Sequence, residues 1–139
     1  MLLGQFNQKY FESLEGHEKI LPPSNRTIYY TIILKGIKIG VVGYFIPFFP
    51  KHSGFIQLAI EPKFRGKGLA ESATKMLIKK DNLEILFSTL DKSNSSSLKF
   101  LLKSGFKFVS KERMNDLRQK GFLEENELRL IKFCWGDLN

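Results

Sequence analysis

Apolar and polar residues alternate along the chain in a pattern that predicts a mixture of strands and helices. Residues 27–34 and 37–46 are two β-branched runs that meet at Lys35-Gly36, which predicts an antiparallel hairpin with glycine in the turn. Residues 55–60 form a short, mostly apolar run of the length expected for a covered strand, and Pro62 ends it. This run is the central strand of the predicted sheet.

The remaining elements follow from the same periodicities. They are one amphipathic helix over residues 4–20, a helix over 69–80, a strand over 83–90, a helix between Asn94 and Gly105, a short strand at 106–108, a short helix over 111–120 and a closing strand over 128–135. Alternation in the central strand puts Phe55, Gln57 and Ala59 on one face and Ile56, Leu58 and Ile60 on the other. A mixed α/β fold is expected, and 139 residues fit a single domain over 1–139.

A glycine-bearing loop without bulky side chains separates the central strand from the helix over 69–80. Such a loop leaves several backbone N–H groups unpaired at the helix N-terminus, where the helix dipole adds roughly half a positive charge. An anion such as a pyrophosphate is therefore a natural ligand, and Arg65 and Lys67 strengthen the positive field.

Two common phosphate-binding motifs do not fit this loop. A Walker loop requires Ser or Thr directly after Gly-Lys, but Gly66-Lys67 is followed by Gly68. The dinucleotide fingerprint requires a third glycine where Glu71 stands, and no repeated strand-helix-strand units follow to form a doubly wound sheet. A different phosphate-binding loop is needed.

Residues 65–70, Arg65-Gly66-Lys67-Gly68-Leu69-Ala70, resemble the Arg/Gln-x-x-Gly-x-Gly/Ala signature of the GNAT superfamily of acyl-coenzyme A-dependent N-acetyltransferases. The match lies at Arg65, Gly68 and Ala70. A second stretch resembles the second motif of that family, in which an Asn opens a helix that closes on Gly-Phe. Its residues are Asn94, Leu98, Leu101, Leu102 and Gly105-Phe106. The resemblance covers about residues 28–109.

Membership of this superfamily implies a GNAT fold: a central mixed, mostly antiparallel sheet of about six to seven strands flanked by helices. It also implies acetyl-coenzyme A as cosubstrate, no metal, and a primary amine as acceptor. Loop residues Arg65, Gly66, Lys67, Gly68, Leu69 and Ala70 would hold the diphosphate, and backbone groups of Leu58, Ala59 and Ile60 would pair with the pantetheine arm. Asn94 is either a helix cap or a cap that also contacts the cofactor, and Lys103 is a candidate for a coenzyme A phosphate.

The catalytic groups of the family are not matched. Many members carry a tyrosine acid seven residues after the Asn, where this chain has Leu101. Some members carry a base five residues before the Asn, where this chain has Thr89. In others, acids on the central strand would fall near Gly54. Displaced candidates are Glu61, Tyr44 and His52. Two hypotheses remain open: an enzyme that acts mainly by positioning, or a catalytically weak acyl-coenzyme A sensor or interaction module.

Two segments are candidates for the acceptor side. In the family the first helices help to form the acceptor wall, so Tyr10, Glu12 and Glu15 are candidates for substrate contact or plain surface residues. The polar segment 110–126 is either a substrate-gating element or a surface helix. The acceptor itself stays open among antibiotics, polyamines, amino acids, and protein lysines or N-termini.

Composition adds few constraints. The net charge of +8 suggests a nucleic-acid binder as a third hypothesis, but coenzyme A phosphates would use part of this charge and no RNA-binding or zinc signature accompanies it. Cys134 is the only cysteine and is better explained by packing than as a nucleophile. With no signal peptide and no membrane span expected, a soluble cytoplasmic protein is predicted. Its oligomeric state is open, with a homodimer as one option.

Overall fold

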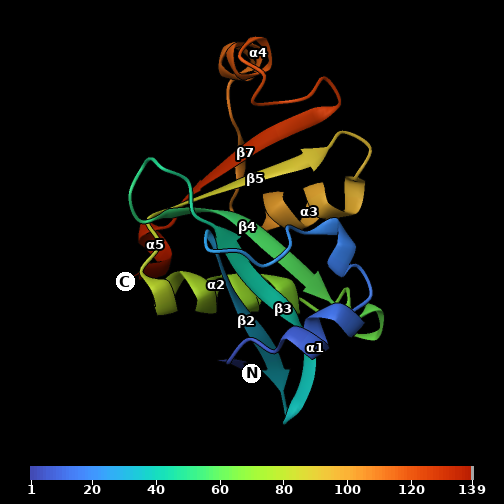
Figure 1. Cartoon of the computed structure of the whole chain (residues 1–139). Helices are drawn as coiled ribbons and strands as arrows, with labels where there is room; N and C mark the ends of the chain where they lie inside the picture. The colour runs from blue at the N-terminus through green and yellow to red at the C-terminus, as the bar shows by residue number, and fades with distance from the viewer. Residues whose placement is uncertain (139) are drawn as a thin grey trace.

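The computed structural model describes residues 1–138, which form one sheet with helices on both faces (Figure 1). The strands of this part of the chain are β1 (Leu2–Gly4), β2 (Thr27–Leu34), β3 (Ile37–Phe45), β4 (Ser53–Ile60), β5 (Ile85–Asp91), β6 (Lys107–Phe108) and β7 (Glu127–Phe133). They lie in the order β1-β2-β3-β4-β5-β7-β6. Every neighbouring pair is antiparallel except β4 and β5. The expected mixed, mostly antiparallel sheet is confirmed.

The predicted hairpin is formed by β2 and β3. Lys35 and Gly36 in its turn have φ angles of 51° and 79°, the two positive values that a tight hairpin turn requires. The register shifts near this turn, because Ile32 pairs with Gly40 and Ile33 with Lys38, which leaves Ile39 of β3 as an extra residue. β3 then pairs with β4 along six residue pairs, from Gly40↔Ile60 to Phe45↔Phe55.

β4 and β5 pair in parallel over only a short stretch. The partners are Ser53↔Ile85, Gly54↔Leu86 and Phe55↔Phe87. Beyond Phe55, β4 continues to Ile60 while remaining paired with β3 on its other edge, and β5 continues to Asp91 while paired with β7. The two strands therefore separate at their carboxyl ends.

The helices divide between the two faces of the sheet. α2 (Leu69–Asp81), α3 (Ser95–Lys103) and α5 (Trp135–Leu138) contribute to one core cluster, together with Ile60, Leu86 and Leu130 from the sheet. On the opposite face, α1 (Gln8–Ser13) packs Phe11 against Tyr29, Val41 and Ala59. The faces predicted for β4 are confirmed, because Ile56, Leu58 and Ile60 join the first cluster and Ala59 joins the second.

The short 3-10 turns η1 (His17–Lys19) and η2 (Pro62–Phe64) and the helix α4 (Lys111–Gln119) complete the fold. α4 lies where the sequence predicts a helix, with Ser110 as its N-cap. Among residues 1–138, no helix has the length and apolar character needed to cross a membrane.

Two element predictions are wrong. The single helix expected over 4–20 is instead β1, the six-residue α1 and η1. Asn7 caps α1 through its side chain, and Gly16 with φ of 95° interrupts the helical pattern. The closing strand ends at Phe133 rather than 135, since Trp135 starts α5, and the Cys134 amide donates to the Glu84 carbonyl at 2.9 Å.

Candidate functional site

The loop between β4 and α2 has the open geometry that its glycines predict. Gly66 and Gly68 have φ angles of 76° and 75°, in the left-handed region where a side chain is strained. A Cβ added at either position would meet no heavy atom within 4 Å. The loop therefore leaves room above its backbone for a ligand to approach.

The amides of this loop are not used by the fold. Within residues 1–138, the N–H groups of Gly66, Lys67 and Gly68 donate to no protein acceptor. Gly68 is the N-cap of α2 and has no side chain to cap the first turn, so the first amides of the helix also lack an intrahelical partner. With the helix dipole behind them, unpaired amides of this kind suit an anionic ligand.

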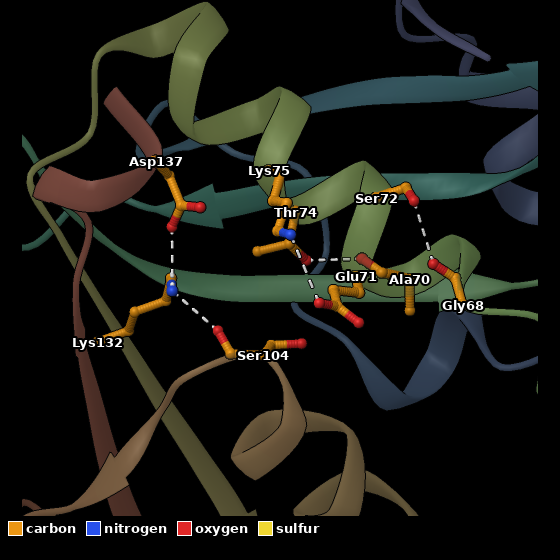
Figure 2. Close-up of polar contacts among 9 residues, drawn as sticks. All are labelled: Gly68, Ala70, Glu71, Ser72, Thr74, Lys75, Ser104, Lys132 and Asp137. Atoms are coloured by element: carbon orange, nitrogen blue, oxygen red, sulfur yellow. Dashed lines mark hydrogen bonds and ion pairs between the residues drawn. The ribbon is translucent and has the colours of Figure 1, made fainter. Parts of the chain in front are cut away.

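Two hydroxyl groups near the start of α2 donate back to carbonyl oxygens one turn earlier (Figure 2). Ser72 Oγ donates to the Gly68 carbonyl at 3.2 Å, and Thr74 Oγ1 donates to the Ala70 carbonyl at 2.8 Å. The one acidic residue in this turn, Glu71, pairs with Lys75 at 3.6 Å. This pair partly neutralises the carboxylate that would oppose an incoming anion.

The side chains of Arg65 and Lys67 make different contacts. Arg65 bends back and donates from Nε to the Ile60 carbonyl at 2.9 Å, which ties the loop to the end of β4. One of the backbone groups predicted to meet the pantetheine arm is therefore already bonded. Lys67 is exposed, with its Nζ 5.8 Å from the centre of the Phe64 ring.

The other predicted cofactor residues line the end of β4 and the start of α3. Leu58 is half-buried, while Ala59 and Ile60 are buried. Asn94 caps α3, because its Oδ1 accepts from the Ser97 amide at 3.1 Å and from Ser96 Oγ at 3.3 Å. The cap is confirmed, and contact with a cofactor stays a prediction. Lys103 is exposed in the last turn of α3.

Leu101, which stands where the family resemblance expects a tyrosine, is a core residue. Its side chain is 3% exposed and packs in the cluster formed by α2, α3 and the sheet. The C-terminus of the same helix is anchored by Lys132, whose Nζ donates to the Ser104 carbonyl at 2.8 Å and pairs with Asp137 at 3.0 Å (Figure 2). Gly105 follows with φ of 93°, as its predicted role in ending the helix requires.

The catalytic candidates lie apart from one another. Tyr44 is buried and donates to Asp81 Oδ2 at 2.8 Å, and Tyr30 donates to Asp81 Oδ1 at 2.7 Å. Burial and this carboxylate raise the pKa of Tyr44. Asp81 ends α2, about 18 Å along the helix from the glycine loop at 1.5 Å per residue. Tyr44 is thus held at the other end of α2 from the loop.

Hydrogen bonds also engage the other two candidates, Glu61 and Thr89, and the loop residue His52. Glu61 Oε1 accepts from Tyr10 Oη at 3.1 Å, which joins α1 to the end of β4. Burial and this carboxylate raise the pKa of Tyr10. Thr89 Oγ1 accepts from Arg129 Nε at 2.9 Å. His52 has φ of 56° and uses its backbone carbonyl to accept from the Glu84 amide.

Arg129 is a residue that sequence reasoning missed. It lies on β7 opposite Thr89 and reaches over β5, so that its guanidinium carbon is 4.8 Å from the centre of the Phe55 ring on β4. No local motif marks it, because the contact depends on the register of three strands. The signal available in the sequence was only an arginine within a strand that also carries Glu127 and Lys132.

Cys134 is buried, and its thiol lies 3.7 Å from the Lys132 carbonyl. Burial raises the pKa of this thiol to about 11, which keeps it protonated at neutral pH and disfavours a nucleophilic role. The packing role expected from the sequence agrees with this position.

Comparison with solved structures identifies the class of fold. A mutant of the spermidine N-acetyltransferase SpeG from Vibrio cholerae superposes with a TM-score of 0.74 at 14% identity, over 100% of this chain and 98% of that one. A Bacillus subtilis acetyltransferase in complex with CoA gives 0.67 at 17% identity, over 95% and 96%. N-acetylglutamate synthase from Neisseria gonorrhoeae, complexed with coenzyme A and N-acetyl-glutamate, gives 0.66 at 18% identity, over 95% of this chain and 34% of that one.

These likenesses show an acetyltransferase fold. The model of the acetyltransferase (GNAT) domain family matches residues 7–107, so the chain belongs to the GNAT acetyltransferase family. None of the curated proteins matches it by sequence.

Proposed function

We propose that this protein transfers an acetyl group from acetyl-coenzyme A to a primary amine, within a complex that holds both substrates. The observation that carries the proposal is the row of unused amides at Gly66, Lys67 and Gly68, beside two parallel strands that separate after Phe55 and Phe87. The row suits a diphosphate, and the separated strand edges suit the amide groups of a pantetheine arm. The neighbour complexes with coenzyme A support this assignment.

The residues of the proposed site would have different binding roles, which depend on their positions. Amides 66–70 and Lys67 hold the diphosphate, and backbone groups at 58–60 on the β4 edge away from β3 align the pantetheine arm. Asn94 at the N-terminus of α3 and Lys103 in its last turn are the further candidates for contact with the cofactor. Since Ile60 already bonds Arg65 through its carbonyl, Arg65 acts by fixing the loop as well as by its charge. Binding of this kind places the thioester beside the acceptor and removes several kcal/mol of barrier by orientation alone.

The reaction requires a neutral amine and a protonated leaving thiol. The amine nitrogen attacks the thioester carbonyl carbon, the carbon–sulfur bond breaks, the amine loses one proton and the thiolate gains one. Leu101 cannot supply that proton, and Tyr44 already donates its hydroxyl to Asp81. Glu61, linked to Tyr10, is the carboxylate we assign to accept the amine proton, directly or through water. Thr89, on β5 past the point where the two strands separate, has a neutral hydroxyl and is not assigned as the base.

A thiol-release assay with acetyl-coenzyme A and a panel of amines tests this function. We expect acceptor-dependent release of coenzyme A and stabilisation of the fold by acetyl-coenzyme A, about 2.7 kcal/mol at a hundredfold excess over Kd. Stabilisation without release for any amine would instead support the sensor hypothesis, for which the buried Leu101 is the specific observation. Absence of stabilisation would refute both.

A further inference from the structure

The Arg129 side chain spans three strands on the face of the sheet opposite α2. Its Nε donates to Thr89 on β5, and its guanidinium lies over Phe55 on β4. Phe55 and Phe87 form the last parallel pair before β4 and β5 separate, and their rings are 5.2 Å apart. The cation therefore stands at the point of separation, on the face where α1 rather than α2 packs.

This arginine has no carboxylate partner among the described residues. Besides the bond to Thr89, its NH2 group donates weakly to the Phe122 carbonyl at 3.3 Å, so three of the five N–H groups of the guanidinium have no protein acceptor in residues 1–138. The side chain is half-buried. Burial lowers the pKa of Arg129, although an arginine stays charged throughout the physiological range.

No carboxylate among residues 1–138 forms an ion pair with Arg129, although the nearby Glu127 carboxylate attracts the guanidinium and partly offsets the lowering of its pKa by burial. Glu127, on the same strand, turns its Oε1 to the Glu124 amide at 2.9 Å. Arg113, on α4, adds a second positive charge and is itself paired with Asp116 at 2.9 Å. A half-buried cation with free donors in such surroundings is suited to a ligand that carries a carboxylate, which the planar guanidinium binds through two parallel hydrogen bonds.

We propose that Arg129 binds a carboxylate of the acceptor, so that the substrate is an amine that also carries a carboxyl group, such as an amino acid or the end of a peptide, and not a polyamine. This inference rests on the proposed function, because it takes the separation of β4 and β5 as the place where the acetyl group is presented. A polyamine would bring several positive charges to an arginine that forms no ion pair within residues 1–138, which is unfavourable.

Matched acceptors test the proposal. Lysine and cadaverine differ only in the carboxylate, and other amino acids can be compared with their amides. We expect kcat/KM to favour the carboxylate member of each pair by tenfold or more, and Arg129→Gln to reduce that ratio to about one, mainly through KM. Arg129→Lys keeps part of the preference. Arg113→Gln is the control, because it removes a neighbouring charge but not the donors at Arg129.

Binding measurements separate this inference from the proposed function. With saturating coenzyme A, N-acetylated amino acids should raise Tm more than their amides do, and only in proteins that retain Arg129. If this Arg129-dependent rise in Tm is seen but the protein acetylates no amine, the proposed function is overturned while the carboxylate site at Arg129 is supported. Faster turnover of cadaverine or spermidine than of lysine would overturn this inference, as would an unchanged ratio in Arg129→Gln. So would loss of acetyl-coenzyme A binding in that variant, because it would place Arg129 in the cofactor site.

Discussion

Substitution of Gly68 by alanine separates the cost to the fold from the cost to the ligand. The residue has φ of 75° and no heavy atom within 4 Å of an added Cβ, so alanine meets no clash and pays only the left-handed strain of about 1–2 kcal/mol. The free energy of unfolding without ligand should fall by that amount. The added methyl group also projects from a backbone that a diphosphate must approach closely, so the affinity for acetyl-coenzyme A should fall as well.

The size of the ligand effect can be stated for one experiment. Urea unfolding is measured with and without acetyl-coenzyme A at a hundredfold excess over the wild-type Kd, where the expected gain is about 2.7 kcal/mol. A tenfold loss of affinity reduces the gain to about 1.4 kcal/mol, and a hundredfold loss reduces it to about 0.4 kcal/mol. We expect Gly68→Ala to give 1.4 kcal/mol or less.

Gly121 provides a matched control. Its φ is 81°, and an added Cβ there also meets no heavy atom within 4 Å. It follows α4, outside the loop between β4 and α2. Gly121→Ala should therefore lose the same 1–2 kcal/mol and keep the whole ligand gain. If Gly68→Ala also keeps the whole gain, the glycine loop does not hold the diphosphate and the proposed cofactor site is wrong.

Three further predictions concern the hydrogen bonds that hold α2 and α3 in place. Asp81→Ala should lower the free energy of unfolding in urea by about 2–4 kcal/mol, because it removes the acceptor of two tyrosine hydroxyls and leaves that of Tyr44 buried; a loss below about 1 kcal/mol would contradict this. Burial raises the pKa of Tyr29 to about 12, and burial with the Asp81 carboxylate raises that of Tyr30 to about 12, from 10.0. Because the folded state then holds these protons more tightly, the tyrosine contribution to stability should be intact below pH 10 and decline between pH 10 and 12. Tyrosinate absorbance, followed together with the urea midpoint across this range, checks the prediction. Ionisation of both tyrosines near pH 10 in the folded protein would refute it. Asn94→Ser should keep the cap of α3, while Asn94→Ala should lower the free energy of unfolding by about 1 kcal/mol. Both variants should bind acetyl-coenzyme A more weakly if the Asn94 amide contacts it. Equal stabilisation by the ligand in the wild type and both variants would show that Asn94 is only a helix cap.

Local signals made much of the fold predictable. The hairpin turn at Lys35-Gly36, the cap at Asn94 and the helix end at Gly105 each depend on the conformational preference of a few adjacent residues. The segment over 4–20 was predicted incorrectly for two reasons. Gly4 pairs with β2 as part of β1, and the Asn7 cap and Gly16 limit the helix to α1.

The same distinction explains what was missed in the candidate site. The glycine loop was found because its residues are contiguous and its chemistry resides in the backbone. The partners of the catalytic candidates are distant in sequence: Tyr10 is 51 residues from Glu61, Tyr44 is 37 from Asp81, and Thr89 is 40 from Arg129. Spacing along the chain carries no information about such pairs, since they depend on strand register and helix placement.

The position of Leu101 acquires a physical explanation from the two faces of β4. On the face towards α2, the side chains of Ile56, Leu58 and Ile60 on β4 are apolar, and Leu101 belongs to the core they form. Two of the catalytic candidates instead make polar contacts outside that core: Glu61 with Tyr10, and Thr89 with Arg129. If the chain is an acetyltransferase, its proton transfers must therefore be served from the acceptor side or by solvent, and a leucine at position 101 is compatible with catalysis through positioning.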